Sequence, residues 1–289
     1  MNESELLAHI YARSENGAPG VRVGPGDDCA VVELAGAPVL LTVDQLIEGR
    51  HYDAGAPLGA IAHKALARSV SDIAAMGGRP RFALATAALP AGFAGADELF
   101  DLMHRTASAL ACPLVGGDIA STSGPATFTT TLVGEPHAAR GPVLRSGARA
   151  GDGVYVTGRL GGSYASGRHL TFTPRVAEAG ALCDAFGADL HAMIDLSDGL
   201  GRDAGRVATA SGVRIELDAA LVPLHDGVAD ALTAASDGED YELLFSASAE
   251  PPAGLATRIG EVVAGEGAVM RLASGELVEI SELGWEHEG

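Results

Sequence analysis

The sequence predicts a protein of mixed α+β or α/β class that is built from two domains. Its 289 residues are enough for two domains of ordinary size. The expected strands and helices alternate without a constant strand–helix–strand period, which argues against a barrel or a regular doubly wound sheet. A segment rich in Gly, Pro and Arg at residues 135–153 separates the two halves. We therefore expect one domain at residues 1–140 and another at residues 141–289.

In the first half, apolar periodicity predicts both helices and strands. The longest helix is expected from Leu58 to Met76, where apolar residues recur at intervals of three and four, and Gly77 and Gly78 end the pattern. Two shorter helices are expected, at residues 3–13 and 97–111. Apolar runs bounded by turn residues predict strands. These strands lie at residues 29–34, 38–44, 82–89, 113–118 and 128–134.

The second half alternates in the same way. A strand at residues 154–158 opens it, and a second apolar segment ends at Ile194. A turn at residues 195–198 leads into a helix that continues to about Ala210. A strand follows at residues 213–218. Further on, residues 236–248 read as a turn that feeds a buried strand, and short β segments make up the tail.

Charge and composition exclude several classes of protein. The chain has 38 acidic and 19 basic residues, a net charge of −19, and such a surface repels nucleic acid and anionic lipid. Its single lysine, Lys64, does not follow a glycine-rich loop, so a P-loop is excluded. No basic segment with an apolar run opens the chain and no apolar stretch approaches 18 residues, so we expect neither a signal peptide nor a membrane span. Three widely spaced cysteines are typical of a cytoplasmic protein without disulfides.

Acidic residues beside turns are the feature that indicates chemistry. Most of them stand at the ends of expected elements next to Gly or Ser, where an aspartate taken singly is most simply a turn or capping residue. Asp72 is different, because it lies inside a predicted helix, where aspartate has poor propensity. The set comprises Asp27, Asp28, Asp44, Asp72, Asp118, Asp195, Asp198, Glu239 and Asp240.

If these side chains converge, the site needs cations. Two carboxylates about 4 Å apart repel by roughly 4 kcal/mol at an effective dielectric constant of 20. A ligand set made only of oxygen atoms favours Mg²⁺ over zinc, and bound Mg²⁺ is commonly completed by the phosphates of a substrate. The acidic set therefore predicts a site for a polyphosphate substrate that binds through metal ions.

Eight motifs in this order resemble the thiamine-monophosphate kinase family, within the superfamily of aminoimidazole ribonucleotide synthetase and selenophosphate synthetase. Each motif is weak alone, but together they extend over nearly the whole chain. They are GPGDDCAVV (24–32), TVDQLIEGRHY (42–52), HKALARSVSDIAAMGGRP (63–80), LVGGD (114–118), RSGARAGD (145–152), VTG (156–158), IDLSDGL (194–200) and SDGEDYEL (236–243).

The resemblance implies an architecture and an activity. It implies a homodimer whose N-terminal domains pair to form a shared β-barrel, with a C-terminal α+β domain alongside that completes the substrate site. It implies a kinase that phosphorylates thiamine monophosphate to thiamine diphosphate with ATP as co-substrate. Transfer would be direct and in-line, assisted by several Mg²⁺ ions. Neither nucleic acid nor membrane is expected as a partner.

The resemblance also assigns roles to residues at the matching positions. The implied metal ligands are Asp28, Thr42, Asp44, Asp72, Asp118, Asp195 and Asp198. The implied nucleotide contacts are Gly117, Asp118, Arg145 and Ser197. The implied substrate contacts are His51, Glu239 and Trp285. Of these, Asp118, Arg145 and Asp198 would act on the transferring phosphoryl group.

Plainer interpretations stand beside these roles. Taken singly, Arg145 is most simply a solvated linker charge and Trp285 a core residue. His51 would be a surface histidine, Glu239 a turn residue and Lys64 a solvated residue on a helix face.

The chain also departs from the family pattern, and this leaves other functions open. The family's Ser-Thr-Asp motif becomes Thr-Val-Asp at residues 42–44, and the region 159–175 is shortened. A related ATP-dependent enzyme with another substrate, or a nucleotide-binding relative without turnover, are the alternatives. A selenophosphate synthetase is disfavoured because no cysteine precedes Cys29.

Overall fold

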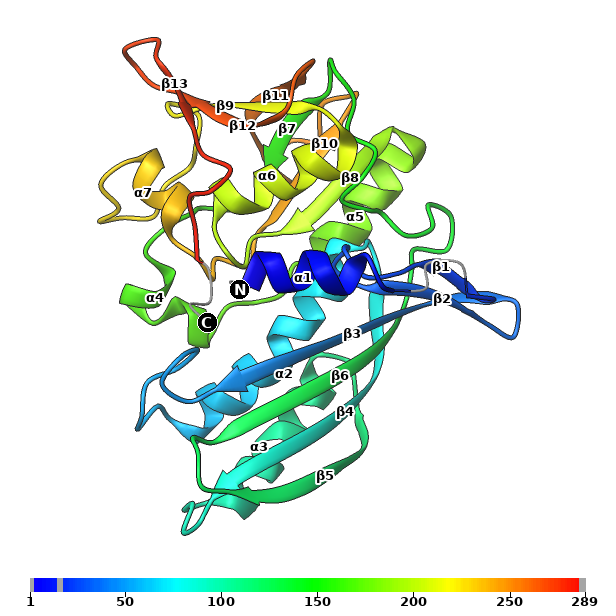
Figure 1. Ribbon diagram of the computed structural model, residues 1–289, viewed down its shortest axis with the longest axis vertical. Coiled ribbons are helices and arrows are strands. Elements are labelled where there is room, and N and C mark those ends of the chain that lie inside the picture. The colour runs from blue at the N-terminus through cyan, green and yellow to red at the C-terminus, as the bar shows by residue number, and fades with distance from the viewer. Residues whose placement is uncertain (1–2, 15–17, 286–289) are drawn as a thin grey trace.

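Two β-sheets, one from each half of the chain, are joined through a long central helix. The structure is a computed structural model and describes residues 3–14 and 18–285. Figure 1 shows one sheet below the other, with α2 (Leu58–Ala75) between them and α1 (Glu3–Tyr11) lying across the junction. Within these described residues, no helix is both long and apolar enough to cross a bilayer.

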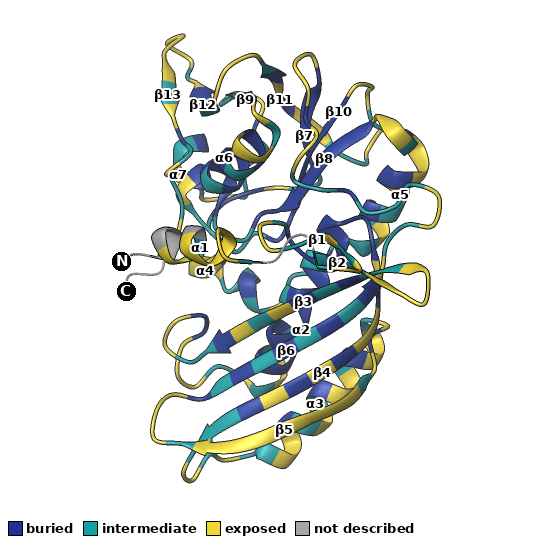
Figure 2. Cartoon of the chain, turned by 45° about the vertical axis from the view of Figure 1, so that its right-hand side comes forward, coloured by how far each residue is buried: buried dark blue, intermediate teal, exposed yellow. Residues whose placement is uncertain are grey.

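The first sheet has six strands and is covered by helices on one face. Its strand order is β1-β2-β3-β6-β4-β5, and all neighbours are antiparallel except the parallel pair β4 and β5. The helices α2 and α3 (Ala96–Ala109) cover the inner face, and the outer face carries exposed side chains (Figure 2). The strands are β1 (Val21–Val23), β2 (Ala30–Leu34), β3 (Ala37–Ile47), β4 (Arg79–Pro90), β5 (Leu114–Thr122) and β6 (Thr127–Glu135).

The second sheet has seven strands in the order β13-β12-β9-β11-β7-β10-β8. Its central strands are buried on both faces, because α6 (Leu200–Ser211) packs on one side while α2 and α5 (Val176–Phe186) pack on the other. The strands are β7 (Gly153–Val156), β8 (Leu190–Asp195), β9 (Arg214–Asp218), β10 (Leu243–Ala247), β11 (Thr257–Val263), β12 (Gly267–Arg271) and β13 (Leu277–Glu279). Shorter helices are α4 (Ser163–Ser166), η1 (Arg168–Leu170), η2 (Gly187–Asp189) and α7 (Ala231–Ser236).

Double-sided burial explains why β7, β8 and β10 read as continuous apolar runs. Successive side chains of a strand point to opposite faces, so a strand that is covered twice carries apolar residues at most positions on both faces. Val154 and Val156 pack in the cluster beneath α6, whereas Tyr155 packs in the cluster that contains Ala74 and Ala75 of α2. The last turn of α2 is therefore part of the core of the second half.

The mixed α+β class is confirmed, and most predicted elements are present with ends that differ by a few residues. Two differences affect the site. Asp44 and Asp118 were expected at the ends of strands, but each lies inside one, because β3 continues to Ile47 and β5 to Thr122. The strand continues beyond Asp44 because residues 45–47 pair with β6, including the polar Gln45, which pairs with Thr129. The strand β1 and the helices α4, α5 and α7 were not predicted.

A glycine of β6 allows α2 to pack closely on the first sheet. A Cβ atom at Gly134 would lie 2.7 Å from Cδ1 and 2.9 Å from Cγ2 of Ile73, which is fully buried. We expect Gly134→Ala to lower the free energy of unfolding by about 1–3 kcal/mol, because the packed core must shift to accept the methyl group. Thermal or urea unfolding measures this change.

The matched control is Gly180→Ala. Gly180 lies inside α5 and a Cβ atom there meets nothing within 4 Å. Alanine is the better helix former by roughly 0.5–1 kcal/mol, so this control should leave stability unchanged or raise it. Equal effects of the two substitutions would contradict the packing explanation.

Candidate functional site

Three carboxylates from distant parts of the chain meet at the junction of the two sheets. Asp28 precedes β2, Asp72 lies in the fifth turn of α2, and Asp195 ends β8. One oxygen from each lies within 4.8 Å of the others. We call Asp28, Asp72 and Asp195 the acidic triad.

Only part of the negative charge in the triad is compensated by hydrogen bonds. Thr42 Oγ1 donates to Asp72 at 2.5 Å, and Ser71 Oγ donates to Asp195 at 2.6 Å. Burial, followed by the nearby charges of Asp44, Asp195 and Asp28, raises the pKa of Asp72 well above its ordinary value. Burial and the charge of Asp28 likewise raise the pKa of Asp195. The site therefore favours a bound proton or a bound cation.

The donor set fits a hard divalent cation. All three triad ligands are carboxylate oxygens, the type that Mg²⁺ and Ca²⁺ prefer. One oxygen of Asp28, Oδ2, is buried without a hydrogen-bond partner, and such an orphaned acceptor is costly unless an ion or a proton satisfies it. Asp44 lies beside the triad, where it accepts from Ser69 Oγ at 3.0 Å and lies 3.8 Å from Arg68.

One arginine connects the triad to the second half. Arg145 Nη2 lies 2.7 Å from Asp28 Oδ1, and its backbone N–H donates to Asp27 at 3.1 Å. Burial lowers the pKa of Arg145, but the charges of Asp28 and Asp27 outweigh burial, so the pKa is raised and the guanidinium stays charged. The linker interpretation of Arg145 is wrong, because its side chain is mostly buried against the triad.

A second acidic group lies at the start of α6. Asp198 pairs with Arg206 at 2.5 Å, and Asp203 pairs with the same guanidinium at 2.6 Å. Asp203 also accepts hydrogen bonds from the backbone N–H groups of Asp198 and Gly199. Burial raises the pKa of Asp203 to about 7 even though Arg206 opposes the shift. The sequence analysis missed Asp203, because an aspartate in a first helical turn is an ordinary finding.

A cavity of about 670 Å³ lies next to these groups and is walled by both halves of the chain. His51, Glu239 and Trp285 all line it, so the structure brings together the three residues implied as substrate contacts. The full lining is Gly49, Arg50, His51, Arg68, Tyr164, Ser197, Asp198, Ser236, Asp237, Gly238, Glu239, Tyr241 and Trp285. Trp285 is 53% exposed, so the expectation that it belongs to the core is wrong.

The cavity combines anionic and aromatic walls. Burial raises the pKa of Glu239, but hydrogen bonding from His169 and the charge of Lys64 outweigh burial, so the pKa is lowered and Glu239 is a carboxylate near neutral pH. Tyr164 stacks on His169 with ring centroids 4.4 Å apart, and Tyr241 stacks on Phe172 at 3.9 Å. Such a site suits a ligand with an aromatic, positively charged part.

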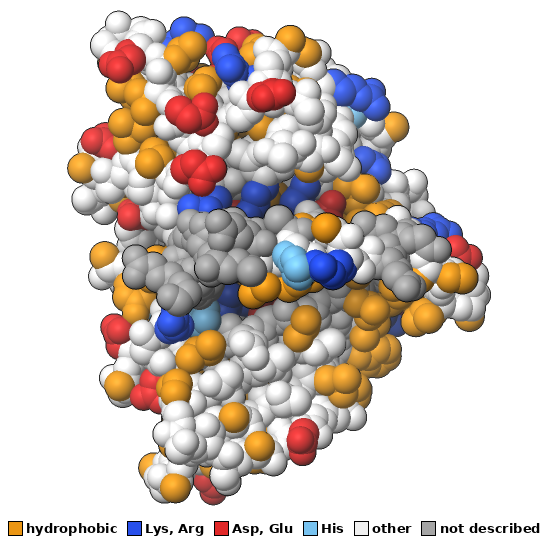
Figure 3. All heavy atoms as spheres, viewed as in Figure 1, with side chains coloured by type: hydrophobic (Ala, Val, Ile, Leu, Met, Phe, Trp, Pro, Cys, Tyr) orange, Lys and Arg blue, Asp and Glu red, His pale blue; other side chains and the backbone are white. Residues whose placement is uncertain are grey.

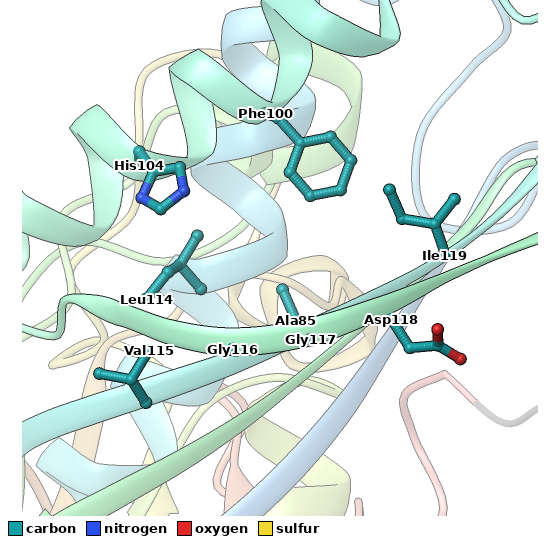
Figure 4. A pocket seen from close by; sticks show the side chains of 9 residues that line it. All are labelled: Ala85, Phe100, His104, Leu114, Val115, Gly116, Gly117, Asp118 and Ile119. Carbon is teal, nitrogen blue, oxygen red and sulfur yellow. The ribbon is translucent and has the colours of Figure 1, made fainter.

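Asp118 and Gly117 lie apart from the acidic triad within one chain. Along the rows of paired residues, β5 is three strands from β3, which separates Asp118 from Gln45 by roughly 14 Å. Figure 4 shows Asp118 pointing away from Phe100 and His104 of α3, which flank a second cavity of about 670 Å³ against β5. The implied metal and nucleotide roles of Asp118 and Gly117 stay predictions.

Lys64 differs most from its expected surroundings. It was expected on a solvated helix face, but its side chain is fully buried beneath the cavity and pairs with Glu239. No local signal distinguished it, because its neighbours in the sequence are those of an ordinary amphipathic helix.

The comparisons with known proteins agree with the motif assignment. Residues 26–135 match the family described as AIR synthase related protein, N-terminal domain. Thiamine-monophosphate kinase of Rhodopirellula baltica is 35% identical and the match covers 99% of this chain and 97% of that protein. Thiamine-monophosphate kinase of Mycobacterium tuberculosis is 36% identical, over 86% of this chain and 82% of that one.

Solved structures also match over almost the whole chain. AaThiL complexed with AMPPCP and TMP has a TM-score of 0.84 at 30% identity, with 99% of this chain and 97% of that chain covered. Thiamine monophosphate kinase from Aquifex aeolicus has a TM-score of 0.77 at 28% identity, with 96% and 99% covered. Hydrogenase maturation protein HypE of E. coli has a TM-score of 0.70 at 18% identity, with 97% of each chain covered, and shows a shared fold alone.

The raised carboxyl pKa values predict that the acidic triad destabilises the metal-free protein at alkaline pH. A carboxyl whose pKa is higher in the folded than in the unfolded chain binds more protons when folded, so the free energy of unfolding falls as pH rises between the two values. We expect Asp195→Asn to be more stable than the parent at pH 8 by about 1–3 kcal/mol, with the gain shrinking toward pH 5. Urea unfolding of parent and variant at pH 5 and at pH 8, in the presence of a chelator, measures the stability difference at each pH.

The control is Asp101→Asn, which replaces an exposed aspartate of α3 and should change stability by less than about 0.5 kcal/mol at either pH. A stabilisation of Asp195→Asn that is the same at pH 5 and pH 8 would refute the electrostatic cause.

Proposed function

The chain belongs to the thiamine-monophosphate kinase family, and on that premise we propose that it transfers the γ-phosphoryl group of ATP to thiamine monophosphate, forming thiamine diphosphate and ADP. The observation that carries the proposal is the acidic triad, in which buried carboxylates lie beside a cavity with aromatic and anionic walls. A kinase that transfers a phosphoryl group between two phosphate-bearing substrates needs this combination of a cation site and a substrate cavity.

The chemistry requires little from a general base. The phosphate monoester of the acceptor has a second pKa near 6, so it is already a dianion at neutral pH. The difficulty is the repulsion between this dianion and the polyphosphate of ATP. Asp28, Asp72 and Asp195, with Thr42 and Asp44 beside them, would hold several Mg²⁺ ions, which supply the charge shielding when bound.

Arginine side chains would complete the charge stabilisation. Arg145 already faces the triad through Asp28, and its planar fork of donors suits phosphate oxygens. Arg206 holds Asp198, which lines the cavity next to Ser197. We propose that Arg145 contacts the transferring phosphoryl group and that Ser197 and Asp198 lie at the boundary between nucleotide and acceptor.

The acceptor fits the cavity by its chemistry. Thiamine monophosphate carries a thiazolium cation and a pyrimidine ring, which suit the carboxylate of Glu239 and the indole of Trp285. We propose His51 as a third contact from the opposite wall. Burial and the charges of Asp72 and Asp28 raise the pKa of the Cys29 thiol, so the thiol nearest the triad is a poor nucleophile, and this supports direct transfer.

We also propose that two chains associate through the outer face of the first sheet. Val43, Phe82 and Leu84 lie on that face and are 62%, 47% and 44% exposed. Figure 3 shows apolar side chains scattered over this face among neutral ones. Asp118 belongs to the same face. Its proposed role as a metal ligand therefore depends on further ligands that a second chain would supply across the interface. The first domain, residues 1–140, would then be the dimerisation unit and residues 141–289 the flanking domain.

The kinase proposal predicts that activity needs the acidic triad. We expect formation of thiamine diphosphate from ATP, Mg²⁺ and thiamine monophosphate, and a loss of about 100-fold or more in kcat/KM for Asp72→Asn, because a carboxylate that holds the shielding cation is removed. Asp101→Asn on α3 is the control and should keep full activity. Absence of product from the parent protein with Mg²⁺ present would overturn the proposal.

Direct transfer has its own stereochemical test. With ATP that is chiral at the γ-phosphorus, a single in-line displacement inverts the configuration, whereas a phosphoenzyme intermediate needs two displacements and retains it. We expect inversion in the thiamine diphosphate that forms. Retention would show that a side chain of the protein takes the phosphoryl group first.

The dimer proposal predicts the effect of a charge on the outer face. We expect the mass of two chains for the parent protein in light scattering and a shift toward one chain for Leu84→Glu, because the half-exposed Leu84 would be buried in the interface. Leu277→Glu is the control, since Leu277 is 44% exposed on β13 of the other sheet. A parent protein that has the mass of one chain would exclude this interface.

A further inference from the structure

Lys64 connects three segments of the cavity from a fully buried position on α2. Its Nζ atom donates to the carbonyl oxygen of His51 at 2.5 Å, lies 2.7 Å from Nδ1 of His169, and pairs with the carboxylate of Glu239. The carbonyl oxygen of His51 and the carboxylate of Glu239 accept from the ammonium group, which has three N–H donors. His169 Nδ1 also lies 2.9 Å from a carboxylate oxygen of Glu239, so its tautomer sets whether it accepts from the amine or donates to Glu239. Burying an ammonium is costly unless acceptors such as these surround it.

The three partners belong to opposite walls of the cavity. His51 lines the wall that comes from the first half of the chain, and Glu239 lines the wall that comes from the second half. His169, from η1, supports the stacked ring of Tyr164, which is another lining residue. One side chain thus connects both walls from beneath.

The wall that carries Glu239 needs to be held. Glu239 and Tyr241 adopt positive φ angles of 65° and 52°, a region that costs a residue with a β-carbon roughly 1–2 kcal/mol. Contacts from outside the segment 237–241 must therefore maintain its shape. The ion pair to Lys64 is one of them, and the stack of Tyr241 on Phe172 is another.

The same helix carries the acidic triad. Asp72 follows Lys64 by eight residues on α2, a rise of about 12 Å along the axis. A rigid helix that holds the cavity walls at one end and a triad carboxylate farther along fixes the distance between an acceptor in the cavity and cations at the triad.

We propose that Lys64 is a positioning residue, which holds the walls of the acceptor cavity at a fixed distance from the acidic triad. The proposal rests on the kinase function proposed above and goes beyond it, because Lys64 acts through Glu239, His51 and His169 and lies beneath the lining of the cavity. Its removal should weaken binding of the acceptor while leaving binding of the nucleotide nearly unchanged.

The test is Lys64→Met, which keeps the length of the side chain and removes its charge, with Lys64→Gln as a second variant should the first not fold. We expect KM for thiamine monophosphate to rise about 10- to 100-fold, KM for ATP to change less than about threefold, and kcat to fall less than the acceptor KM rises. Glu239→Gln and the double variant complete a cycle. Because Lys64 acts through Glu239, the double variant should be no worse than the more impaired single variant.

A measurement without turnover separates positioning from direct contact. Amide hydrogens of residues 237–241 should exchange at least tenfold faster in Lys64→Met than in the parent, since the ion pair that holds the segment is lost. The emission of Trp285, the single tryptophan of the chain and a lining residue, should shift as well. Both readouts use the full chain in the absence of substrates.

A pH profile gives a third readout. Burial, opposed by Glu239, lowers the pKa of Lys64 to about 8. The charged or titratable groups that face its amine are Glu239 from the loop before β10, His169 from η1, and Arg68 on α2 itself, whereas His51 contributes its backbone carbonyl oxygen. The amine loses its proton as pH rises through about 8, so the parent's KM for thiamine monophosphate should rise there, and in Lys64→Met this rise should be absent.

Arg140→Met is the matched control. Arg140 is a partly buried cation that also ties two segments together, through Leu190 O at 2.6 Å, but it does not line the cavity. It should leave KM for the acceptor unchanged.

An acceptor KM within twofold of the parent in an active, folded Lys64→Met variant would overturn the positioning role. So would a raised KM with unchanged amide exchange at residues 237–241, because Lys64 would then contact the acceptor directly. Failure of the parent protein to phosphorylate thiamine monophosphate would instead refute the proposed function.

Discussion

Repulsion among buried carboxylates is the constraint on which the rest of this site depends. Asp28, Asp72 and Asp195 are brought together although burial raises the pKa of Asp72 and Asp195, so folding of the metal-free chain works against their charge. The protein offsets only part of this with hydroxyl donors and one guanidinium. The remaining demand for positive charge is what makes the site a receptor for cations and, through them, for phosphates. The metal-free fold is thus less stable than it would be without these carboxylates, because cation binding needs their uncompensated negative charge.

One helix organises both parts of the site. Within a few turns α2 presents Lys64 to the cavity walls, Arg68 and Ser69 to Asp44, and Ser71 and Asp72 to the triad. Its last turn also packs in the core of the second half through Ala74 and Ala75. A rigid element that contacts both sheets transmits the position of one wall to the other, because packed interiors do not deform continuously. The small residues of this helix allow that close packing.

The cavity and the triad divide the recognition problem between two kinds of chemistry. The triad binds cations that attract phosphates, and it selects little by shape, since a hard cation binds any phosphate oxygen. The cavity distinguishes one acceptor from another by a carboxylate, stacked rings and a fixed separation between its walls. Selectivity for one phosphorylated acceptor would then depend on the walls, including the segment that departs from the family pattern at residues 159–175, where Tyr164 and His169 lie.

The sequence alone determined the fold class, the position of most elements, the family and the unusual placement of Asp72. These follow from local periodicity and from ordered motifs, which a chain displays without folding. It did not determine which carboxylates meet, nor that Asp44 and Asp118 lie inside strands, because strand ends depend on what the partner strand offers. It also gave no sign that the single lysine is buried. Lys64 meets Glu239 across 175 residues, and such a pairing is decided only when two sheets close on one helix.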